Sequence, residues 1–87
     1  MYDKALKEFQ QVLEYRQSVL PADHEDLART CLLLGKAYQG RGKPDDYKRA
    51  IELYEKARSI RVKVYGIDHP SSIEAEKLIQ NLRNNLP

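Results

Sequence analysis

The chain has 87 residues, of which 32% are charged and 41% are hydrophobic, and its formal net charge is +2. This length provides one domain at most, and the low, mixed charge argues against nucleic acid as a partner, since nucleic-acid-binding domains carry a concentrated basic surface. No run of about 18 apolar residues occurs, so we expect no membrane-spanning segment and no membrane partner. The polar start, Met1 to Lys4, is not typical of a signal peptide. The single cysteine, Cys31, excludes an internal disulfide and fits a reducing compartment, so we expect a cytoplasmic protein.

The first half of the chain predicts two helices, over residues 2–20 and 25–41. Apolar residues in the first recur at intervals of three and four, the period of one face of an α-helix. They are Tyr2, Ala5, Leu6, Phe9, Val12, Leu13, Val19 and Leu20. Asp23 can cap the second helix, and we expect Gly40 and Gly42 to end it.

The second half predicts two more helices, over residues 45–65 and 70–85. Pro44, followed by two aspartates, is a typical helix start. We expect Asp68 or Ser71 to cap the last helix. Because the connections are short, neighbouring helices should pack antiparallel in an all-α fold.

The helix over 45–65 also carries the closest approach to a basic patch. Its members are Arg49, Lys56, Arg58, Arg61 and Lys63. Glu52 and Glu55 interrupt them, and Glu52 lies four residues before Lys56, as in helix-stabilising ion pairs. We therefore expect these cations on a solvated helix face.

The sequence repeats itself once, with a period of 45 residues. The identities are Tyr2/Tyr47, Ala5/Ala50, Arg16/Arg61, Val19/Val64, Asp23/Asp68 and His24/His69. A fixed period of this size is typical of repeat arrays, which usually hold a partner. We divide the chain into a half repeat over 2–20, a full repeat over 25–65 and a terminal half repeat over 70–86.

Residues of the second and third predicted helices resemble the tetratricopeptide repeat. The residues that match the family pattern are Cys31, Leu34, Gly35, Tyr38, Ala50, Tyr54 and Ala57. The resemblance implies a right-handed α-α superhelix of antiparallel helix pairs, with four helices and about two repeats. Gly35 and Ala50 would let two helices approach closely, while Tyr38 and Tyr54 fill the wedge between them.

A finer likeness lies at the repeat boundary. The segment Ile60–Pro70 is similar to the boundary in kinesin light chains, where a long helix ends at glycine and Asp-His-Pro opens the next repeat. The family's period is shorter, and we attribute the extra residues 44–46 to a longer turn between paired helices. Paired asparagines of the light chains align with Leu32 and Leu33. Of the inner lysine and asparagine positions with which other repeats grip acidic chaperone tails, only Lys36 fits, so we do not predict that clamp.

The predicted binding surface lies on the second and fourth helices. The second helix is apolar at four consecutive positions, Cys31 to Leu34, which is wider than a single core stripe. Either neighbouring helices cover Leu32 and Leu33, or both leucines line an exposed groove. We favour an interaction scaffold that binds a peptide or helix of a protein partner in a shallow groove. Its residues would be Arg29, Leu32, Leu33, Lys36, Gln39, Lys77 and Asn81.

Self-association is the main alternative. The first helix lacks the partner helix that the repeat pattern would place on one of its faces, so two chains could form a homodimer there. The chain could equally be a packing segment of a larger signalling or regulatory protein. The last helix has Glu76 and Arg83 where the pattern has large apolar residues, as in a solvating cap of an array.

The histidines are the remaining candidates for chemistry. His24 and His69, each after an aspartate, could be metal ligands or catalytic bases, or they could recur as helix caps because the repeat recurs. We favour caps, because no nucleophile accompanies them and they lie a full repeat apart. We interpret Cys31 as a small core residue. The sequence thus predicts no enzyme, no metal site and no cofactor.

Overall fold

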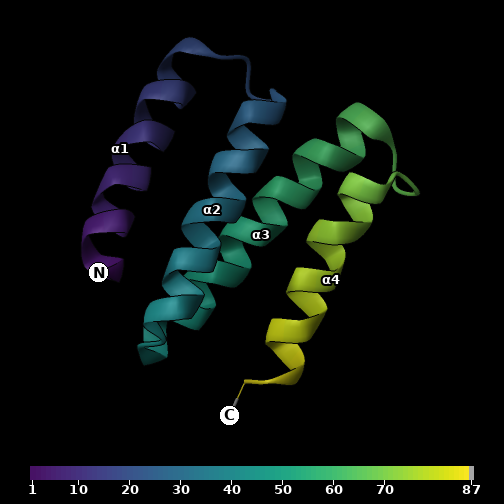
Figure 1. The fold of residues 1–87 in the computed structure, drawn as a ribbon. Coiled ribbons are helices and arrows are strands. Elements are labelled where there is room, and N and C mark those ends of the chain that lie inside the picture. Colours follow the sequence, from purple (N-terminus) through teal and green to yellow (C-terminus); the bar gives the residue numbers. More distant parts are fainter. Residues whose placement is uncertain (87) are drawn as a thin grey trace.

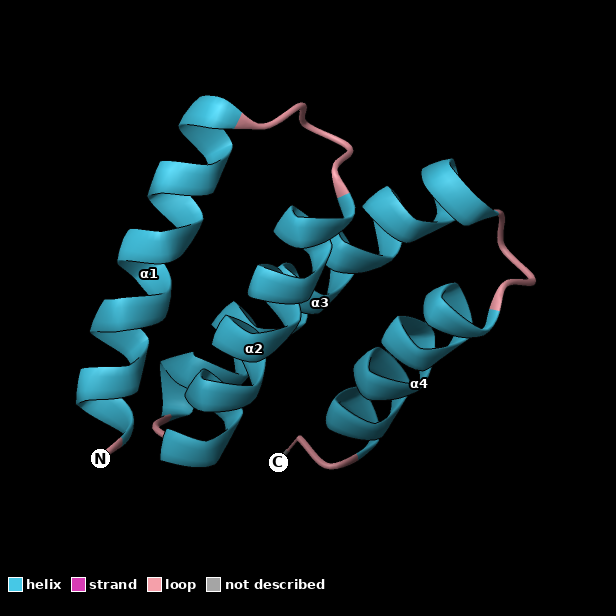
Figure 2. Cartoon of the chain, turned by 45° about the horizontal axis from the view of Figure 1, so that its top comes forward, coloured by secondary structure: helices cyan, strands magenta, loops and turns pink. Residues whose placement is uncertain are grey.

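The computed structural model describes residues 1–86 and contains four α-helices. These are α1 (Tyr2–Val19), α2 (Glu25–Arg41), α3 (Pro44–Tyr65) and α4 (Pro70–Asn84). Each helix packs antiparallel against the next in chain order, so α2 and α3 have neighbours on two sides (Figures 1 and 2). Residues 1–86 include no strand, and every expected helix is present with bounds that differ by one residue at most. The predicted all-α fold is confirmed.

The core lies in the seams between successive helices. Its buried apolar residues are Leu6, Leu13, Leu27, Ala28, Cys31, Leu32, Leu34, Ala37, Ala50, Tyr54, Ala57, Ile60, Ala75, Ile79 and Leu82. The tightest seam is the one between α2 and α3, where a Cβ atom built on Gly35 would lie only 2.6 Å from Cε1 of Tyr54. The predicted close approach at Gly35 is therefore confirmed, and a side chain at this position would collide with the tyrosine ring.

The two motif tyrosines differ in burial. Tyr54 is fully buried, and its hydroxyl donates a hydrogen bond to Oε1 of Gln39 (2.8 Å). Burial raises the pKa of Tyr54 to about 12. Tyr38 is only partly buried, and the guanidinium groups of Arg41 and Arg49 lie 5.7 and 5.8 Å from its ring centre. Tyr54 is thus the core wedge, and Tyr38 is a platform for two cations at its edge.

The connection between α2 and α3 is shorter than expected. α2 continues through Gly40 and is capped by Gly42, whose φ of 73° lies in the left-handed region and whose N–H donates to the carbonyl of Tyr38 (3.0 Å). α3 begins at Pro44, so residues 44–46 form its first turn. The prediction of a longer turn is wrong, because proline at the first helical position and acidic residues at the positive end of the helix dipole favour helix.

Asp46, in this first turn, anchors the connection. Its carboxylate is fully buried and accepts two hydrogen bonds from Arg41, each of 2.7 Å, and one from the backbone N–H of Lys43 (3.1 Å). The bond from Arg41, reinforced by the Lys43 amide, lowers the pKa of Asp46 to about 2. Arg41 also donates to Asp3 on α1 (2.8 Å). One guanidinium therefore joins α1, the end of α2 and the start of α3.

Histidines are the N-cap residues of α2 and α4. Nδ1 of His24 accepts from the N–H of Asp26 (3.0 Å), and Nδ1 of His69 accepts from the N–H of Ser71 (3.1 Å). The interpretation of both histidines as recurring caps is confirmed. Capping by Asp23, Asp68 or Ser71 was the wrong expectation, since the histidine rings occupy these positions themselves.

Arg61 is buried, contrary to the expectation of a solvated face. It is 7% exposed, and its guanidinium lies 3.2 Å from both Glu25 on α2 and Glu74 on α4, while donating to the carbonyl of Ser71 (2.9 Å). The expectation failed because it used only the spacing of charges within α3. The residues that bury and pair with Arg61 belong to α2 and α4. Arg61 therefore links three helices.

Candidate functional site

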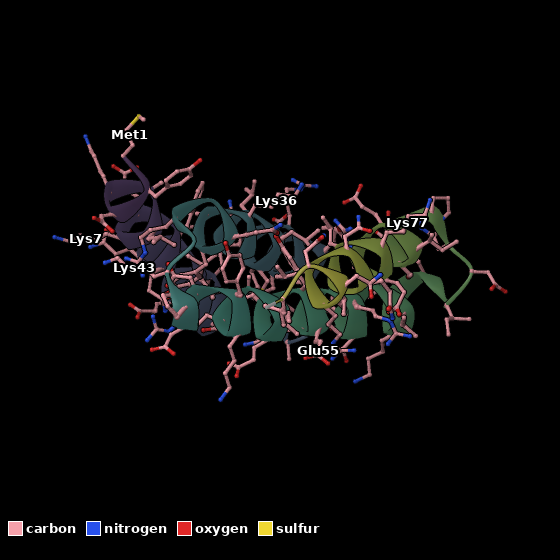
Figure 3. All side chains as sticks on the ribbon, turned by 90° about the horizontal axis from the view of Figure 1, so that it is seen from below. Met1, Lys7, Lys36, Lys43, Glu55 and Lys77 are labelled. Carbon is pink, nitrogen blue, oxygen red and sulfur yellow. The ribbon has the colours of Figure 1, made fainter. Side chains whose placement is uncertain are left out.

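Several of the predicted groove residues lie on one face of the molecule. Lys36 on α2 and Lys77 on α4 project from the same side, opposite Glu55 of α3 (Figure 3). Arg29, Leu33 and Lys36 follow one another at helical spacing along α2, and all three are exposed. Leu33 is 42% exposed, which makes it an accessible apolar side chain between two cations.

Leu32 does not belong to this surface. It is only 4% exposed and is part of the core, so it offers no contact to a partner and its predicted binding role must be corrected. The reason is the position of α2 in the stack. Because α1 and α3 pack on two sides of α2, they cover a wide part of its surface. Of the four consecutive apolar residues, Cys31, Leu32 and Leu34 are buried and Leu33 is exposed.

Gln39 is exposed, yet its side-chain oxygen is already bonded. The hydroxyl of Tyr54 occupies Oε1 at 2.8 Å, so Gln39 helps to hold the core wedge at the edge of the face. Its amide nitrogen is the group left to contact a partner.

On α4 the structure adds a shallow hollow of about 430 Å³. Its lining residues are Pro70, Ile73, Glu74, Lys77, Leu78 and Asn81. Lys77 and Asn81 thus line the same hollow, with Leu78 beside them. Leu78 is the 45-residue equivalent of Leu33. Both α2 and α4 therefore carry a leucine among polar and basic side chains.

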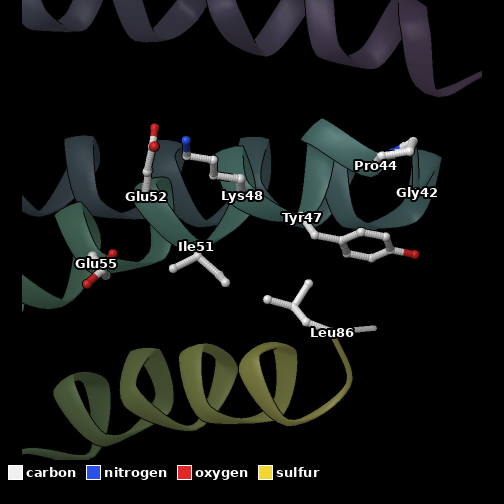
Figure 4. A pocket seen from close by; sticks show the side chains of 8 residues that line it. All are labelled: Gly42, Pro44, Tyr47, Lys48, Ile51, Glu52, Glu55 and Leu86. Carbon is white, nitrogen blue, oxygen red and sulfur yellow. The ribbon is translucent and has the colours of Figure 1, made fainter.

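A second hollow, which sequence reasoning missed, lies between the start of α3 and the end of α4. It measures about 660 Å³ and is lined by Gly42, Pro44, Tyr47, Lys48, Ile51, Glu52, Glu55 and Leu86. Leu86 follows the end of α4 and faces Tyr47 and Ile51 (Figure 4). The 45-residue repeat could have indicated this hollow, because Leu86 stands at the position equivalent to Arg41. The arginine that closes the corresponding end of α2 is therefore replaced by a leucine.

Among residues 1–86 the structure shows neither a cluster of metal ligands nor an exposed thiol. Within residues 1–86, no three side chains of histidine, cysteine, aspartate or glutamate are placed to hold a metal ion. Cys31 is fully buried, and this burial raises the pKa of its thiol, which opposes formation of the reactive thiolate. In the same part of the chain, no helix combines the length and hydrophobicity needed to cross a bilayer.

The antiparallel helices follow a period of 45 residues, and Gly35 lies against Tyr54 where α2 meets α3. These features are those of α-helical repeat proteins. A family model described as "Tetratricopeptide repeat" matches residues 27–71, just over half of the chain, from α2 to the first turn of α4. The chain belongs to the tetratricopeptide repeat family. Its members are in general non-enzymatic protein–protein interaction modules. No curated protein and no solved structure matched the chain.

Proposed function

We propose that this protein is an interaction scaffold whose α2/α4 face binds a peptide or a short amphipathic helix of a partner protein. The observation that carries the proposal is Leu33. Leu33 is the one exposed large apolar side chain of α2, 42% exposed, and a partner that covered it would remove this apolar surface from water. Leu78 offers a partly exposed apolar contact on the adjacent α4.

The charges around Leu33 indicate the chemistry of the partner. Three cations, Arg29, Lys36 and Lys77, share this face with two carboxylates, Asp26, which lies 3.8 Å from Arg29, and Glu74, which lines the hollow beside Lys77. We therefore expect an apolar anchor flanked by acidic residues. The anchor would supply affinity, while the exposed charges would set the register and the rate of association.

The likeness of Ile60–Pro70 to kinesin light chains leads us to propose that subtype as well. At the positions aligned with the paired asparagines of the light chains, Leu32 is buried and Leu33 is exposed. An apolar contact at Leu33 would then replace amide hydrogen bonds. The expected partner segment is accordingly more apolar than one held by asparagines.

The test begins with a random peptide library displayed on phage and selected on the immobilised intact chain. We expect the enriched peptides to combine one large apolar residue with aspartate or glutamate. Leu33→Asp should weaken their binding at least tenfold without changing helix content by circular dichroism. The matched control is Val64→Asp, which replaces a similarly exposed aliphatic residue on α3 and should leave binding unchanged.

A second pair of variants keeps the proposal testable if Leu33→Asp unfolds the chain. Lys36→Glu and Lys77→Glu replace exposed side chains and should each weaken binding of the acidic peptides. Unaltered affinity in both lysine variants, or equal affinity of the selected peptides for the Leu33→Asp and parent chains, would contradict the proposed face.

A further inference from the structure

A shallow groove lies between α1 and α3, which both pack against α2. It consists of two hollows that share Lys56. The smaller hollow, of about 280 Å³, has Gln10 of α1 on one side and Arg49 and Lys56 of α3 on the other. The larger, of about 440 Å³, lies between the connection from α1 to α2 and the second half of α3. We call these two hollows together the α1/α3 groove.

The α1/α3 groove is separate from the α2/α4 face. α3, which forms one wall of the groove, lies on the side of the molecule opposite Lys36 and Lys77 (Figure 3). None of the exposed residues of the α2/α4 face lines either hollow. A ligand in the groove would therefore leave the α2/α4 face free.

The floor of the α1/α3 groove is apolar. Leu34, Tyr38 and Leu53 line the smaller hollow, and Ala22 and Ile60 line the larger one. Tyr38 and Leu53 are only partly buried, so a ligand can reach them. A segment that lay on this floor would remove apolar surface from water.

The wall formed by α3 is basic at regular intervals. Arg49, Lys56 and Lys63 are seven residues apart and are all exposed. Seven residues correspond to about two turns of an α-helix, so the three cations recur every 10.5 Å or so along one side of α3.

The two lysines of this row lack ion-pair partners, whereas the arginines of α3 have them. Among residues 1–86, no carboxylate lies within 4.0 Å of the ammonium group of Lys56 or Lys63. The helix-stabilising pair that the sequence indicates between Glu52 and Lys56 is thus not formed. Arg49, Arg58 and Arg61 are each paired with a carboxylate. The lysines therefore carry the charge that is available to a ligand.

Two carboxylates interrupt the row of cations. Glu52 lies between Arg49 and Lys56 along α3, and Asp23 lines the hollow that contains Lys56 and Lys63. A nucleic acid has a negative charge on every phosphate, so some of its phosphates would lie beside these carboxylates. A polypeptide can place neutral residues there. Alternating charges therefore favour a peptide over a nucleic acid.

Size and spacing favour an extended peptide over a helix. A helix with its side chains is about 10 Å across, whereas the smaller hollow, at about 280 Å³, is no larger than the smallest ligand pockets and has room for single side chains. In the polyproline II conformation, every third residue points the same way, about 9.3 Å from the last. That repeat is close to the spacing of the cations on α3.

We propose that the α1/α3 groove binds an extended segment of a partner protein that carries aspartate or glutamate at every third position. Successive carboxylates of the segment pair with Arg49, Lys56 and Lys63. The residues between them are neutral, cover Tyr38 and Leu53, and lie beside the two carboxylates of the groove. This proposal does not depend on the α2/α4 face.

The probe is a fluorescein-labelled peptide that contains Glu-Pro-Pro three times, because proline holds the backbone in the polyproline II conformation. It is titrated with the intact chain and followed by fluorescence anisotropy. The matched control peptide has the same composition, with three consecutive glutamates followed by six prolines. We expect saturable binding of the probe and binding of the control peptide that is weaker by about fivefold, because only the probe repeats at the spacing of the cations.

Charge reversal locates the site. Lys56→Glu and Lys63→Glu should each weaken binding about fivefold, since each variant replaces an exposed attraction by a repulsion. Lys48→Glu is the matched control, because it makes the same charge change at an exposed lysine of α3 that lines the hollow beside α4. It should leave binding unchanged. Circular dichroism checks that all three variants keep their helix content.

A swap of charges tests direct contact. In a second peptide, lysine replaces the central glutamate, which faces Lys56 in either direction of the peptide. This peptide should bind the parent chain weakly and the Lys56→Glu chain more tightly, because opposite charges then face each other again.

Leu33→Asp and Lys36→Glu in the chain should leave binding of the Glu-Pro-Pro probe unchanged. Failure of the α2/α4 proposal and failure of this one are therefore distinguishable. Loss of probe binding in either variant would place the probe on the α2/α4 face and contradict the groove.

Three further results would overturn the inference. The first is the absence of saturable binding up to about 1 mM of the chain. The second is equal binding of the two peptides of the same composition, or an equal loss in the Lys48→Glu and Lys56→Glu chains, since overall charge would then explain the binding. The third is an oligothymidine that displaces the probe and itself binds less tightly to the Lys56→Glu chain, because the groove would then prefer nucleic acid.

Discussion

The contact between Gly35 and Tyr54 makes a sharp prediction about stability. In Gly35→Ala the new Cβ would lie 2.6 Å from Cε1 and 2.9 Å from Cδ1 of Tyr54. The ring cannot move away freely, because Tyr54 is fully buried and its hydroxyl is bonded to Gln39. One of the two helices must therefore shift, or the ring must leave its preferred rotamer.

Two opposing effects decide how much Gly35→Ala changes the free energy of unfolding. Overpacking of a dense core costs about 1–3 kcal/mol, whereas replacing glycine by alanine inside a helix gains about 1 kcal/mol. Since the overlap involves a ring held at both ends, we place the cost in the upper part of its range. We expect Gly35→Ala to lower the free energy of unfolding by about 1–2 kcal/mol.

Gly40→Ala is the matched control. Gly40 is also within α2, and a Cβ there would also meet an aromatic ring, that of Tyr2. Tyr2, however, is 47% exposed and begins α1, so its ring can swing into solvent. The gain in helix propensity then dominates, and we expect this variant to be neutral or more stable by up to about 1 kcal/mol.

Urea denaturation of both variants, followed by circular dichroism at 222 nm, measures these differences. For a domain of this size, 1 kcal/mol corresponds to a shift in Tm of about 4–8 °C, so thermal melts provide an independent check. The reasoning would be refuted if Gly35→Ala were as stable as the parent chain, or if the two substitutions had the same effect.

Three further predictions concern neighbouring groups. Leu32→Ala should lower the free energy of unfolding by about 2–4 kcal/mol and Leu33→Ala by less than about 1, since only Leu32 is in the core; equal urea midpoints would contradict this. His69→Ala should cost about 1 kcal/mol through loss of the α4 cap, whereas Asp68→Ala should change stability by less than about 0.5, both measured by urea titration. Asp46→Asn should be less stable than the parent at neutral pH, and the difference should shrink as the pH falls from about 4 towards 2. Because the pKa of Asp46 is lowered on folding from 3.8 to about 2, its stabilisation is complete above the unfolded-state pKa and is lost as the carboxylate becomes protonated. A difference between the two chains that stays constant over this range of urea titrations would refute that role of the carboxylate.

Local patterns were sufficient for the helices and for their closest contact. Apolar residues at intervals of three and four, with proline and glycine at the ends, placed all four helices to within a residue. The spacing around Gly35 and Tyr54 identified the tight seam between α2 and α3. Such features are encoded in neighbouring residues, because helix formation and capping involve groups only a few positions apart.

The exposed residues of the proposed α2/α4 face were predicted only in part. Helical spacing correctly joined Arg29, Leu33 and Lys36 on one exposed face of α2. It could not show that Leu32 is covered, since the number of helices packed on α2 determines how wide its buried stripe is. Nor could it show that Leu86 turns back towards α3, which depends on where α4 ends.

The sequence by itself determined the four helices and their antiparallel order, because each rests on residues close together in the chain. The tertiary structure alone decided that Arg61 is buried between two carboxylates and that Asp46 joins α2 to α3. The physical reason is the same in each case. Burial and charge pairing depend on side chains contributed by other helices, and the identity of those neighbours is fixed only when the helices pack.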